Sequence, residues 1–236
     1  MSTDPEFKTA DDLPGATLPP SLENDAPSAS TEQEERNRRK EQKRLDALTW
    51  VPPNESVPVR YQDVELGHKT VQRNFNVWFV QIQIVMHKLQ NFLPEQKSVG
   101  EEKASEVLGL IDARIQAIEK AVDDEIGRLR IVAKENDIDL GEKAFSSAIK
   151  LTVPRFTPFA SRMLRVIRRV DELYWMAESL WIEGAIKEKH KWNIVNQYRK
   201  LLWTFVRETT AIWVRARNSL RAERLTRRDA DVAKAA

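Results

Sequence analysis

A dense run of basic side chains falls within twenty residues of the second half of the chain. It consists of Lys150, Arg155, Arg162, Arg165, Arg168 and Arg169, and no acidic residue follows Lys150 before Asp171. Spacings of three and four place Arg162, Arg165 and Arg169 on one face of a helix. Cations in the early turns of a helix oppose its macrodipole, so the pattern favours an anionic partner such as phosphate. The alternative is ion pairing with acids of the long helix that precedes them, and both interpretations remain open.

Alternating side chains between residues 57 and 66 predict a short strand. In a ribbon that enters the major groove of DNA, Arg60 would suit guanine and Gln62 would suit adenine. If the strand is instead centred on Val64 and Leu66, its outward side chains are acidic. Arg60 and Gln62 would in that case be ordinary exposed residues of an edge strand.

Three polar residues open the helix that follows this strand, namely Lys69, Thr70 and Arg73. The first backbone amides of a helix have no partner within the helix and favour anions. These side chains and amides are therefore candidates to hold a DNA phosphate.

Catalytic and metal chemistry have little support. The chain has no cysteine and only three histidines, and no glutamate stands three residues before His87 or His190. No glycine-rich phosphate loop occurs among the seven glycines. We therefore expect no enzyme activity, no catalytic residues, no cofactor and no metal site.

Charge and composition divide the chain into four parts. Residues 1–35 hold nine acids and one lysine, which leaves a net charge of +10 for the rest. Residues 1–30 are predicted to be a disordered acidic leader, and residues 31–48 a charged basic arm. Residues 49–226 are predicted to form a helical domain, and residues 227–236 a frayed tail.

The helical domain is predicted to be mainly α, an antiparallel bundle of long helices with one or two short strands. Apolar periodicity predicts helices over about 69–93, 99–136, 158–183 and 187–224. A second short strand near 148–153 is a possible partner for the strand near 57–66. A single strand and a helix apolar on most sides both need partners, so we expect a homodimer or a higher homo-oligomer.

Several segments resemble a known family. They are YQDVELGHKTVQRNFNVWFVQIQIVMHKL, KLTVPRFTPFASRMLRVIRRVDEL and LWIEGAIKEKHKWNIVNQYRKLLW, in that order. The pattern is similar to that of the AcaB-like transcriptional regulators of conjugative plasmids and integrative elements, over roughly residues 44–222. The resemblance implies a DNA-binding regulator with a ribbon-helix-helix-like dimerisation element, in which strands from two subunits read the groove.

The sequence thus predicts a DNA-binding transcriptional regulator of a bacterial mobile genetic element, with double-stranded DNA as partner. The residues expected to bind DNA are Arg60, Gln62, Lys69, Thr70, Arg73, Arg155, Arg162, Arg165 and Arg169. The alternative is a helical scaffold or accessory protein of a conjugation system without nucleic-acid contact. No run of 18 apolar residues and no secretory signal occurs, so we expect a cytoplasmic protein with no membrane partner.

Overall fold

The computed structural model describes residues 33, 36, 39, 51–52, 57–92 and 100–235. The chain divides into two units, Met1–Lys40 and Glu41–Ala236. In the first unit, residues 33, 36 and 39 are helical and exposed. The predicted leader (1–30) and most of the predicted basic arm (31–48) lie outside the described residues. The rest of the description concerns the second unit.

The second unit is mainly helical, as predicted. In chain order its elements are β1 (Arg60–Leu66), α2 (Lys69–Phe75), the π-helical segment η1 (Asn76–Gln81), α3 (Ile82–Phe92), α4 (Gly100–Glu135), β2 (Ile149–Arg155), α5 (Pro158–Ile182) and α6 (Glu188–Ala235). Among the described residues, no helix has both the length and the apolar content needed to cross a bilayer.

Helix α5 is the central helix of the bundle and contacts α2, α3, α4, α6 and β2. Thr157 caps its first turn by accepting a 3.1 Å hydrogen bond from the Ala160 amide, and Pro158 fits the first position because it needs no hydrogen-bond partner there. Gly184, with φ of +75°, ends the helix in the left-handed conformation that glycine favours. These boundaries agree with the sequence prediction.

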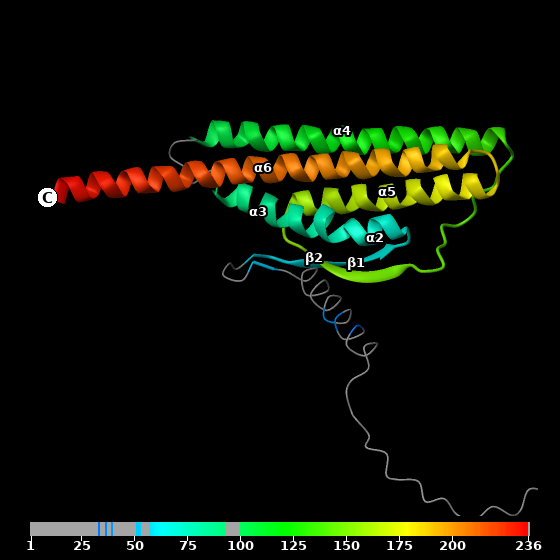
Figure 1. The fold of residues 1–236 in the computed structure, drawn as a ribbon, viewed down its shortest axis with the longest axis horizontal. Coiled ribbons are helices and arrows are strands. Elements are labelled where there is room, and N and C mark those ends of the chain that lie inside the picture. The colour runs from blue at the N-terminus through cyan, green and yellow to red at the C-terminus, as the bar shows by residue number, and fades with distance from the viewer. Residues whose placement is uncertain are drawn as a thin grey trace, which may run out of the picture. The chain divides into compact units, whose positions relative to one another are not determined.

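The helices do not simply alternate in direction. Ion pairs link the early part of α5 to the early part of α4, and later residues to later ones, so α4 and α5 are parallel (Figure 1). The chain returns between them through β2. Helix α6 runs antiparallel to both, and its last part extends beyond the other helices (Figure 1).

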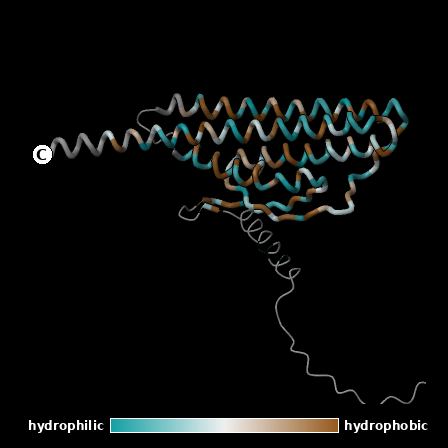
Figure 2. The backbone as a smooth tube through the Cα atoms, viewed as in Figure 1, coloured by the Kyte–Doolittle hydropathy of each residue, from teal (hydrophilic) through white to brown (hydrophobic). Residues whose placement is uncertain are grey.

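Hydrophobic and hydrophilic residues are interspersed along each long helix (Figure 2). The apolar ones meet in one continuous core, with Trp78, Phe75, Phe79, Tyr174 and Leu202 among its fully buried side chains. Burial of these side chains supplies most of the drive to fold.

The two strands pair with each other in a two-stranded antiparallel ribbon, in the register Gln62 with Val153 and Val64 with Leu151. Val64 and Leu66 are buried on the side that faces the helices. β1 begins at Arg60, so residues 57–59 of the predicted strand precede it.

This pairing removes one sequence argument for an oligomer, because β1 obtains its hydrogen bonds within the chain. The second argument also fails, because the strongly apolar α3 packs against α5 and α6 of the same chain. The oligomeric state itself stays a prediction.

Helix α6 is longer than predicted, since it continues to Ala235 and not to Arg224. Residues beyond 224 are charged and rich in alanine, which favours helix without a packing partner.

Candidate functional site

The arginines at the end of β2 and on α5 separate into two groups with different surroundings. Arg162 forms ion pairs with Asp112 and, at 2.7 Å, with Glu119 of α4. Arg169 forms a 2.7 Å ion pair with Asp123, which is also on α4. The hydrogen bond to Glu119 raises the pKa of Arg162. The expectation that Arg162 and Arg169 are left free is therefore wrong, and pairing with the preceding helix is correct for both.

Arg155, Arg165 and Arg168 form the second group, which we call the cleft arginines. Arg165 and Arg168 are exposed, and neither has an ion pair with any residue that the structure describes. Arg155 donates a 2.9 Å hydrogen bond from Nη1 to the Ser161 hydroxyl, and its Nε is buried without an acceptor among the described residues. These three guanidinium groups carry charge that no described carboxylate offsets.

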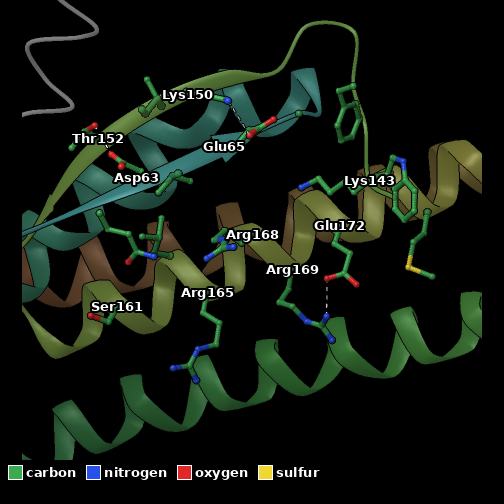
Figure 3. Close-up of a pocket in the computed structure, with 18 of the residues that line it drawn as sticks. Asp63, Glu65, Lys143, Lys150, Thr152, Ser161, Arg165, Arg168, Arg169 and Glu172 are labelled. Atoms are coloured by element: carbon green, nitrogen blue, oxygen red, sulfur yellow. Dashed lines mark hydrogen bonds and ion pairs between the residues drawn. The ribbon is translucent and has the colours of Figure 1, made fainter. Parts of the chain in front are cut away.

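The cleft arginines line a cleft of about 1230 Å³ between the ribbon and α5 (Figure 3). Arg130 of α4 and residues of the 140–145 loop complete its wall. Seven basic and three acidic side chains line it, so the cleft is positive. A concave wall of one charge sign concentrates the field and attracts ions of the opposite sign.

The other basic residues of the cleft each have a carboxylate partner among the described residues. Glu172 accepts from Arg130 at 3.0 Å and from Arg169 at 2.7 Å, as the dashed line to Arg169 in Figure 3 shows. Lys150 lies 3.9 Å from Glu65 across the ribbon, an exposed and weak pair. The uncompensated positive charge is therefore concentrated at the cleft arginines.

One stripe of α5 faces the cleft. Ser161, Arg165, Arg168, Glu172 and Trp175 follow one another at intervals of three and four residues and all line it. The sequence prediction of site residues omitted Arg168 and Trp175. Their spacing from Arg165 was the signal that could have identified them.

The backbone amides around the start of α2 have hydrogen-bond acceptors within the chain. The fully buried carboxylate of Asp171 accepts hydrogen bonds from the amides of Gly67 at 3.0 Å and His68 at 2.8 Å, and from the Lys143 ammonium at 2.5 Å. The Thr70 amide donates to Nδ1 of His68 at 3.1 Å. Of the amides at the predicted phosphate site, that of Thr70 already has an acceptor within the chain, so the prediction is wrong for this amide.

The side chains of Lys69 and Arg73 remain exposed at the start of α2.

His68 is buried, and its Nε2 lies 3.2 Å from Glu178 of α5. Because Nδ1 already accepts a hydrogen bond, Nε2 is the nitrogen that donates to Glu178. The hydrogen bond from His68 lowers the pKa of Glu178. After the hydrogen bonds of Asp171, this contact is a second link between the start of α2 and α5.

The exposed side of the ribbon does not carry the side chains that base recognition in the major groove requires. Asp63 and Glu65 are exposed, whereas Gln62 is half-buried on the side shared with Val64 and Leu66. Asp63 accepts a 2.6 Å hydrogen bond from the Thr152 hydroxyl (Figure 3). The outward pair is thus acidic, which corrects the expectation that Arg60 and Gln62 form the outward face.

The structure brings together four of the predicted site residues, since Gln62, Arg155, Arg165 and Arg169 all line the cleft. Arg60 is exposed and lies opposite Arg155 in the ribbon register. The cleft lining does not include Arg60, Lys69, Thr70, Arg73 or Arg162. Within the described part of the chain, no three histidine or carboxylate residues are grouped as metal ligands.

The chain is similar in fold to a protein of known structure. No family model matches the chain, and no curated protein matches it. A solved structure that is similar is the crystal structure of selenomethionine-containing AcaB from uropathogenic E. coli. The identity is 18%, the TM-score is 0.59, and the match covers 71% of this chain and 86% of that chain. The fold of this chain is therefore similar to that of AcaB over the matched part.

Proposed function

We propose that this chain is a DNA-binding transcriptional regulator of a bacterial mobile genetic element. The regulator class is supported by the resemblance of its sequence to the AcaB-like transcriptional regulators and by the fold relation to AcaB. DNA binding is supported mainly by exposed arginines that have no ion pair among the described residues. They are Arg217 and Arg221 on α6.

The proposed mechanism is neutralisation of phosphates. Arg217 and Arg221 are exposed and share one face of α6 by their spacing of four, so a DNA backbone can approach both. The exposed Arg60, Lys69 and Arg73 are further candidates for phosphate contacts. Base reading by the ribbon is a lesser part of the proposal, because its outward side is acidic.

The experiment is a measurement of DNA affinity against salt. Fluorescence anisotropy with a labelled duplex should give a log–log slope of about −0.9 for each phosphate neutralised. Replacing both Arg217 and Arg221 with alanine should reduce the slope by about 2. The matched control is Arg114→Ala, because Arg114 is 63% exposed but already paired with Glu208 at 2.8 Å. An affinity that does not change with salt would exclude this mechanism.

A helical scaffold or accessory protein without nucleic-acid contact is the second candidate. It is favoured by the ion pairs that hold Arg162 and Arg169 to α4. In that case no duplex binds even at low salt. The homo-oligomer expected from the sequence is tested separately by light scattering, in which a monomer would contradict it.

A further inference from the structure

We infer that the cleft between the ribbon and α5 binds a free nucleotide, with the phosphates on the cleft arginines and the base against Trp175. This site goes beyond the proposed DNA contact and does not depend on it. A cleft of about 1230 Å³ is slightly larger than the roughly 300–1,000 Å³ that is typical of small-ligand sites, so a nucleotide fits within it.

The phosphate end is defined by the cleft arginines. Arginine presents a planar fork of donors that matches phosphate oxygens in pairs. Arg165 and Arg168 have no ion pair among the described residues, so binding a phosphate requires no internal pair to break. The Ser161 hydroxyl accepts from Arg155 at 2.9 Å and holds that guanidinium at the cleft wall.

The base end lies farther along the same helix. Trp175 is half-buried and lines the cleft together with Phe145 and Met176. An indole suits an aromatic base, which stacks or packs edge-on against it. The apolar and the basic parts of the cleft are thus at different positions along α5.

The separation of the two ends fits a nucleotide. Arg168 and Arg165 precede Trp175 by seven and ten residues, which corresponds to about 10–15 Å along the helix. That is the span between the base and the phosphates of an extended nucleoside triphosphate. Glu172 lies between the ends but is compensated by Arg130 and Arg169, so it does not repel the phosphates with a free charge.

The charge of the cleft also selects the ligand class. The three cleft arginines favour two or three phosphate groups over a single one, because each guanidinium can take its own oxygens. A neutral nucleoside has no phosphate oxygens for these guanidinium groups to bind. A bare pyrophosphate leaves the aromatic end unused.

The test is isothermal titration of the full chain with adenosine triphosphate, pyrophosphate and adenosine, without magnesium and without DNA. We expect the triphosphate to bind, pyrophosphate to bind more weakly by about tenfold, and adenosine not to bind. Equal affinity for the triphosphate and pyrophosphate would overturn the base contact. No binding of either would overturn the site.

Variants locate the site. The double change Arg165→Ala with Arg168→Ala should lower triphosphate affinity by at least about tenfold. Arg217→Ala with Arg221→Ala, at exposed positions outside the cleft, should leave it unchanged. Trp175→Leu should weaken the triphosphate but not pyrophosphate, a split that simple loss of folding would not give. Equal weakening of both ligands by Trp175→Leu would overturn the assignment of the base end.

A titration with a single-stranded oligonucleotide without terminal phosphates tests whether the cleft binds a nucleic-acid strand or a free nucleotide. If it binds through Arg165 and Arg168 while the free triphosphate does not, the cleft serves a strand and the inference is wrong. Because these titrations contain no duplex, their failure is distinguishable from failure of duplex binding in the salt experiment.

Discussion

Replacing Asp171 with alanine should destabilise the protein by about 2–6 kcal/mol. The carboxylate is fully buried and is the acceptor for the amides of Gly67 and His68. Each buried amide left without an acceptor costs about 1–3 kcal/mol, and two are left. The Lys143 side chain is 33% exposed, so its ammonium can turn to water and adds little to the loss.

The assay is urea denaturation followed by far-UV circular dichroism at neutral pH. The control is Asp123→Ala, because the Asp123 side chain is 55% exposed and its ion pair with Arg169 should contribute less than about 1 kcal/mol. Lys143→Met should cost less than Asp171→Ala, since both amides keep their acceptor. Equal losses for Asp171→Ala and Asp123→Ala would refute the reasoning.

Three further changes probe the same molecule. Gly67→Ala places a Cβ against the ring of Phe145 and should cost about 1–3 kcal/mol in thermal unfolding. Phe145→Ala should restore part of this loss, and no recovery would contradict the clash. Arg162→Ala should cost about 1 kcal/mol and leave the salt dependence of DNA binding unchanged, because the guanidinium is held by α4; a reduced slope in anisotropy would place Arg162 on the DNA. The pKa of Glu178 lies below its ordinary value of 4.5, so its pair with His68 is complete above that value and is lost as the pH falls through the lower folded pKa. Glu178→Gln should therefore lose less stability than the unchanged chain over this acid range in a pH titration of unfolding, and identical acid profiles would show that the pair contributes nothing.

The helices were predictable because their apolar residues recur at three- and four-residue spacing over long stretches. Local cap signals at Thr157 and Gly184 fixed both ends of α5. The π-helical turn at Asn76–Gln81 was not predictable, since its extra residue per turn is set by packing and has no sequence signal here. The parallel course of α4 and α5 also depends on tertiary contacts that local patterns do not contain.

The site was predictable in part. The basic run from Lys150 to Arg169 identified Arg155 and Arg165, but the sequence did not indicate which arginines face the acids of α4. That distinction depends on a rotation of about 100° per residue around the helix axis and on where α4 lies. The role of Asp171 was hidden for a similar reason, because its partners Gly67 and His68 are more than one hundred residues away in sequence.

The ribbon has a consequence for the order of folding. Asp63 and Thr152, hydrogen-bonded across it, are 89 residues apart, so the ribbon is not a hairpin that a local turn can nucleate. Closing so long a loop has an entropic cost that increases with the logarithm of its length, and contacts of high sequence separation slow folding. The helical segments between the strands are therefore expected to collapse first, and strand pairing to follow as a late, slow kinetic phase.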